Sequence, residues 1–226
     1  MFLKLLTSMA SRELLKELCA RYQRESQQAV TVEAAGGVDV AQRLRAGEPV
    51  DVAVLSRASI DDLAREKVLL RDSITDIANA GISVAVAAGA APPDISDEDT
   101  LRRAVLEAPS ISYSTGPSGV YLEKLFAAWG VLDRIRPRIV VPPPGMPVGS
   151  LVASGKAALG FQQLSELINV AGIRVLGPLP AAIQLLTTFS GAIAHTSGNA
   201  NAARELLRYL ASPQVAAAKA DFGMQP

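Results

Sequence analysis

The sequence contains few of the side chains from which metal centres and nucleophilic active sites are built. Its 226 residues include one cysteine and one histidine. A single cysteine cannot form a disulfide within the chain, and a lone histidine without cysteines or carboxylates at ligand spacing does not predict a metal site. The sequence also lacks a nucleophile elbow, a phosphate-binding loop with lysine and a dinucleotide fingerprint. We therefore expect neither a metal nor another cofactor.

An excess of either charge is also absent. The 22 basic and 22 acidic residues cancel, and no run of lysines or arginines interleaved with aromatic residues predicts a nucleic-acid groove. No segment approaches the roughly 18 unbroken apolar residues of a membrane span. We expect no nucleic-acid partner and no direct insertion into a membrane.

The first residues, "MFLKLLTSMASRELL", lack the apolar run and the small-residue cleavage site of an export signal. As written, the chain predicts a cytoplasmic protein. A processed exported protein given a new initiator methionine would read the same way, and that protein would be periplasmic. Both locations stay open.

What the sequence does contain is a regular alternation of short apolar runs and amphipathic segments. Strands are expected at residues 3–6, 29–37 and 50–56, each followed by a helical pattern, with Ser59 as the N-cap of the third helix. Such alternation predicts an α/β fold with mainly parallel sheets flanked by helices. Hydrophobic residues make up 49% of the chain, which is ample for a core.

Two apolar strands enclose a block of alternating elements in the middle of the chain. They lie near residues 82–88 and 188–195. The simplest arrangement is a discontinuous lobe I, residues 1–81 and 193–226, with an inserted lobe II, residues 82–192. We expect the two strands to cross between the lobes as a hinge, with a small ligand in the cleft between them.

The segment "YSTGPSGVYLEKLF", residues 113–126, reads as a strand end, a hydroxyl-rich turn and a helix. The first backbone N–H groups of a helix have no partner within it, and the helix dipole adds positive charge there. Ser118 can cap the helix or donate to a ligand, and Gly116 and Gly119 let the main chain come close. Tyr113 and Tyr121 can close over a ligand or fill the core.

Three further small-residue turns come after strands and before helices, at residues 7–11, 34–38 and 142–150. Four helix N-termini gathered at one cleft would hold an oxyanion or a carboxylate without any charged side chain, because oriented backbone donors neutralise it. The expected ligand is therefore a small anion.

The order of several segments resembles a known family. "TSMASRELLKELCARYQRES", "RLRAGEPVDVAVLS", "PSGVYLEKLFAAWGV", "LVASGKAALGF" and "LLRYLASPQVAAAKADFG" are similar to the molybdate-binding-protein-like branch of the type II periplasmic binding proteins. The resemblance covers nearly the whole chain. It implies two α/β lobes that close over an oxyanion held by hydroxyls and backbone amides.

The chain departs from that branch where molybdate binders place hydroxyl ligands. Ala10 occupies the position of a serine, Gly36, Gly37 and Val38 replace serines of the second turn, and Gln163 stands where a tyrosine is expected. The missing donors argue against tetrahedral molybdate as the ligand.

The segments at 118–122, 147–167 and 172–180 resemble more specifically a side branch of the family that includes aconitate isomerase. The string "GFQQLSEL" is the most specific match, although it can mark the scaffold of that branch as readily as its chemistry. The resemblance implies an organic acid ligand and, for an enzyme, cis–trans isomerisation of a small unsaturated tricarboxylate.

Together, the turns and the resemblance define a set of expected ligand contacts. They are Thr7, Ser8, Met9, Gly36, Gly37, Val38, Ser114, Ser118, Gly119, Val120, Met146, Pro147, Val148, Gln162 and Gln163.

Catalytic residues are harder to find. An isomerase needs a group that takes a proton from carbon, and Glu33, Asp39 and Glu166 are the acidic candidates near the expected cleft. Asp39 also fits an early-helix residue favoured by the dipole, and Glu166 a solvated one. Arg12 can reach a carboxylate or stay exposed.

For the histidine and the cysteine, the sequence favours structural roles over catalytic ones. His195 fits a surface or hinge residue, and Cys19 a buried, inert thiol.

Two functions remain open. The first is a solute-binding protein that captures a small carboxylate or oxyanion and, if exported, delivers it to a membrane transporter. The second is an isomerase of aconitate-like acids, or an intracellular sensor, on the same scaffold. Whether the chain is an enzyme is not decided by its residues.

Overall fold

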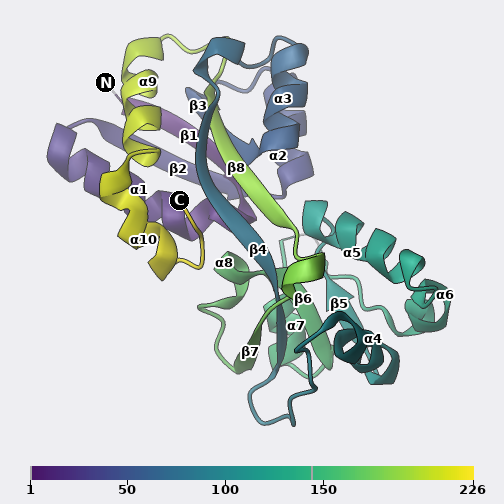
Figure 1. Ribbon diagram of the computed structural model, residues 1–226. Helices are drawn as coiled ribbons and strands as arrows, with labels where there is room; N and C mark the ends of the chain where they lie inside the picture. Colours follow the sequence, from purple (N-terminus) through teal and green to yellow (C-terminus); the bar gives the residue numbers. More distant parts are fainter. Residues whose placement is uncertain (1, 144) are drawn as a thin grey trace. The chain divides into compact units, whose positions relative to one another are not determined.

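A computed structural model describes residues 2–143 and 145–226 of the chain (Figure 1). The chain forms two compact units: unit 1 comprises Met1–Ala80 and Thr187–Pro226, and unit 2 comprises Gly81–Leu186. The first change of unit falls one residue before the boundary expected from the sequence, and the second falls six residues before it. Residues 189–193 pair with the third strand of unit 1, which is why they belong to that unit.

Unit 1 contains a sheet whose first three strands run parallel. Strand β1 (Phe2–Ser8) lies between β2 (Ala29–Ala35) and β3 (Val52–Ser56), and β8 (Leu186–Ile193) pairs with β3 in the antiparallel direction. In the register, Ser8 lies opposite Ala35, and Thr7 lies opposite Val54. The carboxyl ends of the three parallel strands therefore meet at one edge of the sheet.

Helices cover both faces of this sheet (Figure 1). One face carries α1 (Arg12–Ser26), α9 (Ala200–Leu210) and α10 (Ala216–Asp221), and the other carries α2 (Gly37–Arg45) and α3 (Arg57–Arg65). Each face has its own apolar cluster. Cys19 lies buried in the first cluster, where burial raises the pKa of its thiol to about 12. The prediction that the thiol is buried is confirmed.

Unit 2 combines parallel and antiparallel pairing. Strands β5 (Ile111–Tyr113) and β6 (Leu159–Gln163) are parallel, whereas β4 (Thr75–Ala87) pairs antiparallel with β6 and with β7 (Ile173–Pro178). Strand β4 begins in unit 1 and ends in unit 2. Parallel pairing is thus confined to the strands that precede helices.

Five helices accompany the sheet of unit 2. They are α4 (Glu98–Glu107), α5 (Pro117–Ala128), α6 (Leu132–Ile135), α7 (Val148–Ala153) and α8 (Leu164–Leu167). In the core, Phe126 of α5 contacts Phe161 of β6 with ring centroids 5.9 Å apart. In the segment "RIVV", Ile139 forms an isolated parallel bridge with Ile111.

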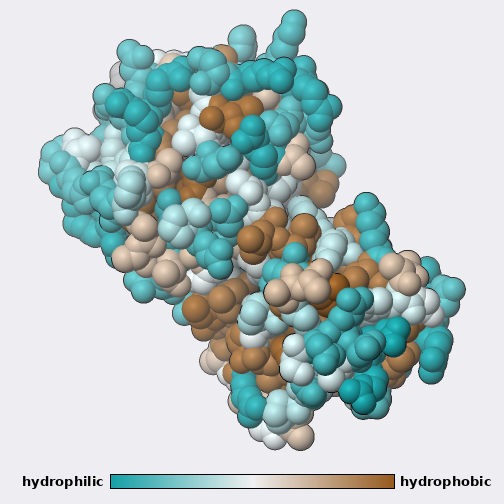
Figure 2. Space-filling model, viewed as in Figure 1, coloured by the Kyte–Doolittle hydropathy of each residue, from teal (hydrophilic) through white to brown (hydrophobic). Residues whose placement is uncertain are grey.

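The two units differ at the surface. Among residues 2–143 and 145–226, seven large apolar side chains are exposed, and five of them belong to unit 2, namely Val120, Val141, Met146, Ile168 and Leu186. In the face shown in Figure 2, the helices of unit 1 are mainly hydrophilic, and brown, apolar areas lie over unit 2. None of the helices within residues 2–143 and 145–226 has the length and apolar character needed to cross a membrane.

A network of four charged side chains fixes α2 to the sheet of unit 1. Lys4 of β1 lies 2.9 Å from Glu48 and 3.3 Å from Glu33, and Arg43 of α2 donates to both glutamates. Hydrogen bonds from Arg43 and then Lys4 lower the pKa of Glu48 to about 2. The network joins β1, β2 and the last turn of α2.

We predict that Glu48→Gln flattens the acid side of the stability profile. The pKa of Glu48 is lower in the folded chain than its ordinary value of 4.5, so its contribution is present above pH 4.5 and is lost as the pH falls toward 2. Urea unfolding across this range should show a shallower loss of stability for the variant. Glu107→Gln, at an exposed position without an ion pair in the described chain, should follow the unmodified protein. Parallel profiles for Glu48→Gln and the unmodified protein would contradict the assignment.

Candidate functional site

Three strands of unit 1 end at the same edge, and each leads into the start of a helix. β1 leads through a 3-10 turn (Met9–Ser11) into α1, β2 leads through Gly36 into α2, and β3 leads through Ser56 into α3. Free N–H groups and the positive ends of helix dipoles gather at this edge. The turns expected at 7–11 and 34–38 are thus neighbours within one unit.

The hydroxyl groups after β1 divide into structural and available ones. Thr7 is fully buried, and its hydroxyl donates to Val54 O at 2.9 Å and lies 2.7 Å from Ser11 Oγ. Ser8 is half-buried, with its Oγ 3.5 Å from Ser11 Oγ, and Met9 is also half-buried. The Thr7 hydroxyl is therefore engaged within the chain and positions Ser11. Of the two hydroxyls after β1 that were expected to contact a ligand, the one that remains accessible is that of Ser8.

The start of α2 lies beside Ser8. A Cβ added to Gly37 would come within 3.9 Å of Ser8 Cβ, and Val38 is 66% exposed. A Cβ added to Gly36 would lie 3.0 Å from Asp39 Oδ2. The Asp39 carboxylate thus lies close to the N-terminus of its own helix, as an early-helix acidic residue does.

Two other charged candidates of unit 1 are engaged elsewhere. Arg12 Nε donates to Glu13 Oε1 at 2.6 Å. Glu33 belongs to the Lys4–Arg43 network, and hydrogen bonds from Arg43 and Lys4 lower its pKa. Neither side chain is placed as a free acid, base or anion ligand.

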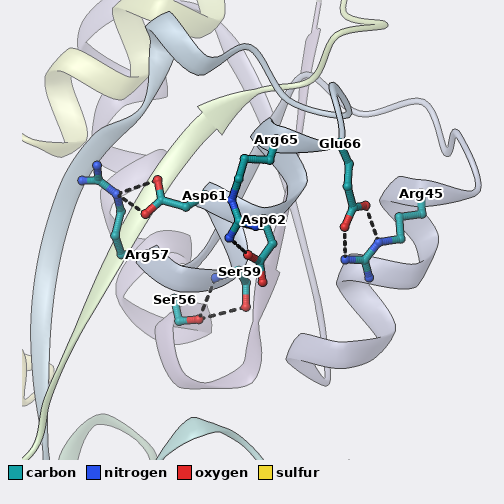
Figure 3. Close-up of polar contacts among 8 residues, drawn as sticks. All are labelled: Arg45, Ser56, Arg57, Ser59, Asp61, Asp62, Arg65 and Glu66. Carbon is teal, nitrogen blue, oxygen red and sulfur yellow. Dashed lines mark hydrogen bonds and ion pairs between the residues drawn. The ribbon is translucent and has the colours of Figure 1, made fainter.

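The start of α3, the third helix of unit 1, has a side-chain cap of its own. Ser56, rather than the predicted Ser59, is the N-cap of α3. The Ser56 hydroxyl accepts a hydrogen bond from the Ser59 N–H at 3.5 Å, and the two hydroxyl oxygens are 2.9 Å apart (Figure 3). The sequence pattern misled because Ser56 also ends a strand, and the helix begins three residues earlier than its apolar spacing indicates.

Charged side chains around α3 are paired. Figure 3 shows Arg57 with Asp61 and Arg45 with Glu66, at N–O distances of 3.1 and 2.6 Å. Arg57 also contacts Asp76 at 2.9 Å. These guanidinium groups stabilise the surface of unit 1 and are not free to bind an anion.

In unit 2, the start of α5 is built around two serines and a glycine. Ser114 Oγ and Ser118 Oγ are 2.7 Å apart, and Ser118 is 3% exposed. A Cβ added to Gly119 would lie 1.6 Å from Ser114 O. Glycine at 119 thus lets the helix approach the preceding turn, as its role in the sequence pattern indicated. The N-cap Gly116 provides no side-chain cap.

The end of β6 contributes buried polar atoms that lack partners within the described chain. Gln162 and Gln163 are each 3% exposed, and their Oε1 atoms and Ser165 Oγ have no hydrogen bond. Gln163 points to the same face of the sheet as Phe161, which contacts α5, because side chains alternate along a strand. Buried polar groups without partners are rare in folded proteins and indicate a ligand or ordered water.

The remaining expected contacts of unit 2 differ in exposure. Val120 is 52% and Met146 41% exposed, whereas Val148 is fully buried. Pro147 is the N-cap of α7, and Val148 is the first residue of this helix. Because the Val148 side chain lies in an apolar cluster, only its backbone is available to a ligand. Pro144, within the expected turn at 142–150, lies outside the described residues.

Both tyrosines near the α5 turn have internal partners. Tyr113 donates to Glu123 at 3.1 Å, and burial followed by this contact raises the pKa of its phenol to about 12. Tyr121 donates to Ile183 O at 2.7 Å. Each phenol thus has a hydrogen bond within unit 2. His195 is exposed, as expected for a surface residue.

Three serines of these edges are absent from the expected contacts, namely Ser11, Ser56 and Ser165. Ser11 belongs to the small-residue turn at residues 7–11, so the sequence alone could have identified its hydroxyl as a candidate ligand contact. Only the structure shows the hydroxyl of Ser165 without a partner in the described chain. No periodic pattern distinguishes it from other helix serines.

Solved structures of anion-binding proteins share this fold. The periplasmic molybdate-binding protein of Azotobacter vinelandii superposes with a TM-score of 0.82 at 21% identity, covering 99% of both chains. The sulfate-binding protein SubI of Mycobacterium tuberculosis superposes with a TM-score of 0.78 at 15% identity, covering 99% of this chain and 86% of its own. At these identities the likeness shows the fold alone, and it confirms the expected fold class.

Residues 3–225 match the family described as bacterial extracellular solute-binding protein, and the chain belongs to that family. Within the curated proteins, it is similar to the aconitate isomerase of a Pseudomonas species. The two are 40% identical over 190 residues, which span 83% of this chain and 71% of the relative. The family resemblance seen in the sequence is confirmed.

We predict that Gly119→Ala disrupts the α5 turn. The added methyl group overlaps Ser114 O, so α5 must move, and we expect the free energy of unfolding to fall by about 2–3 kcal/mol. Chemical denaturation measures this loss. Gly89→Ala is the matched control in unit 2, because a Cβ there meets nothing within 4 Å. Equal stability of the two variants would contradict the close approach.

Proposed function

We propose that this protein binds a small organic anion carrying more than one carboxylate. The observation that carries the proposal is that α2 and α5, which follow the small-residue turns, have no side-chain cap, as is also true of α1 and α7, whereas α3 and α4 are capped by Ser56 and Asp97. The free N–H groups at the starts of α2 and α5 favour a carboxylate.

The side chains around the two starts favour an organic acid over a metal oxyanion. Val38 in the first turn of α2 and Val120 in the first turn of α5 present exposed apolar surface, which suits a carbon skeleton, and Met146, just before α7, is also exposed. Gln163 can present either its carbonyl oxygen or, after rotation of the amide, its NH₂ group. The hydroxyl Ser118 supplies a neutral donor. A polycarboxylate with a short carbon chain uses both kinds of contact.

Membership of a solute-binding family supports capture of a solute as the basic activity. In an exported protein, the bound anion would pass to a membrane transporter. In a cytoplasmic protein, the same binding would serve a sensor or an enzyme.

We predict that the double substitution Ser118→Ala and Gly37→Val abolishes binding of trans-aconitate. The first change removes a hydroxyl donor at α5, and the second puts a branched side chain over the start of α2, where Gly37 is exposed and has an ordinary backbone φ. Isothermal titration calorimetry should show a loss of at least tenfold in affinity for each single variant.

Circular dichroism and thermal unfolding show whether the single variants and the double variant stay folded. Ser154→Ala, at an exposed serine directly after the last residue of α7, is the hydroxyl control and should bind normally. Unchanged affinity in the double variant would refute the assignment of these residues.

A second candidate function is isomerisation of aconitate. The observation that favours it is the 40% identity with the Pseudomonas aconitate isomerase over most of this chain. Removal of a proton from the methylene carbon gives a dienolate, and return of a proton to the former vinylic carbon shifts the double bond without net oxidation or reduction. Backbone N–H groups would stabilise the enolate oxygen, and Asp39 is the proposed proton carrier.

We predict that the protein converts trans-aconitate to cis-aconitate and that Asp39→Asn lowers the rate at least 100-fold while affinity changes less than threefold. The amide keeps the shape of the side chain but cannot accept the proton. Proton NMR follows both isomers directly, and solvent deuterium should enter the product.

Asp99→Asn is the control for this test, because Asp99 occupies the first turn of α4 as Asp39 occupies that of α2. Binding without any conversion at high protein concentration would eliminate the isomerase and leave the solute-binding proposal standing. Full activity in Asp39→Asn would eliminate Asp39 alone as the proton carrier.

A further inference from the structure

Unit 1 contains a cavity on the side of the sheet that carries α10. Its volume is about 230 Å³, and it is lined by Asp76, Ile77, Ala78, Asn79, Ala211, Ser212, Pro213, Ala216, Lys219 and Pro226. All these residues belong to unit 1. None of them is among the expected contacts of the solute.

A lysine lies in the wall of this cavity without a counter-ion. Lys219 is 2% exposed, and its amine has no hydrogen bond or ion pair to any residue that the structure describes. Burial, with no compensating charge, lowers the pKa of the amine. Lysine is almost never buried unless it is paired, and here the side chain is buried while its unpaired amine is accessible from the cavity that Lys219 lines.

A second polar atom beside the cavity has the same property. Ser212 Oγ is buried and has no hydrogen-bond partner in residues 2–143 or 145–226. Ser212 follows α9, whereas Lys219 lies within α10. Two donors from different elements therefore line one space, and each of them is unsatisfied by the chain.

The other polar residues of the wall are already occupied. Asn79 donates to Pro226 O at 3.0 Å and accepts from Thr188 Oγ1 at 2.8 Å. Asp76 Oδ1 accepts from Ser190 at 2.6 Å and from Arg57 at 2.9 Å, and the ion pair with Arg57 offsets the charge of this carboxylate. The donors of the wall that lack a partner in the described chain are thus Lys219 Nζ and Ser212 Oγ, and most of the other lining residues are apolar.

We propose that this cavity binds a short aliphatic carboxylate, whose oxygens accept hydrogen bonds from Lys219 Nζ and Ser212 Oγ. Ile77, Pro213 and Ala216 would contact its hydrocarbon part. A carboxylate satisfies both donors and supplies the charge that the amine lacks. This site is independent of the proposed solute contacts.

The test is a titration of the Ser118→Ala, Gly37→Val double variant with sodium butyrate, so that the proposed solute site cannot respond. We expect saturable shifts of the backbone amide signals of Ala78, Asn79 and Ala216 in nitrogen-15 NMR. The NMR signal of the Lys219 carbon that carries the amine should shift with the same affinity. This measurement requires no substitution at Lys219.

Lys219→Met in the same background should weaken the response at least tenfold. Lys67→Met is the matched control, because Lys67 is an exposed lysine of unit 1 and should leave the response unchanged. Butanol and butylammonium have the same chain length without the carboxylate, and neither should saturate the site.

An absent Lys219 signal shift, an unaltered response in folded Lys219→Met, or an equal response to butanol would each overturn the proposal. Butyrate binding in the background double variant would support this site whatever becomes of aconitate binding. If Lys219→Met does not fold, the Lys219 carbon signal in the background double variant decides alone.

Discussion

The arrangement of this protein depends on parallel strands that end at one edge of a sheet and continue as helices. In unit 1 the register sets Ser8 beside Ala35, and in unit 2 it sets Tyr113 beside Phe161. Each such edge collects helix N-termini, whose N–H groups the helices themselves cannot satisfy. The antiparallel strands β4 and β8 complete the sheets. Polarity at the edges thus comes from the backbone before any charged side chain is placed.

Arginines and lysines have a different task in this chain. In unit 1 they form ion pairs on the surface, such as Arg45 with Glu66, or tie α2 to β1 through Lys4 and Arg43. The starts of α2 and α5 instead carry a hydroxyl and small or apolar side chains, namely Ser118, Gly37 and Val38. Neutral groups of this kind discriminate by shape and hydrogen-bond geometry, whereas a cluster of cations would accept many anions. Selectivity among organic acids is therefore compatible with a net charge of zero.

The alternation of strands and helices and the turn before α5 could be predicted from local patterns, because both depend on residues close in sequence. Contacts between distant residues could not. The sequence predicts that the Thr7 hydroxyl contacts a ligand. In the structure, this hydroxyl donates a hydrogen bond to Val54 O, 47 residues away along the chain. The N-cap of α3 is Ser56 rather than Ser59, since the β3 register decides where the strand ends. The unpartnered atoms of Gln162 and Gln163 depend on burial that no periodicity expresses.

The uncapped start of α5 has a consequence for the lifetime of the protein in a cell. A helix start that lacks its own cap is less stable than one with a cap such as Ser56 provides for α3. A guest that occupies those donors adds its binding free energy to the folded state only. Nutrient supply would then regulate resistance to proteolysis, with starved molecules degraded sooner than occupied ones.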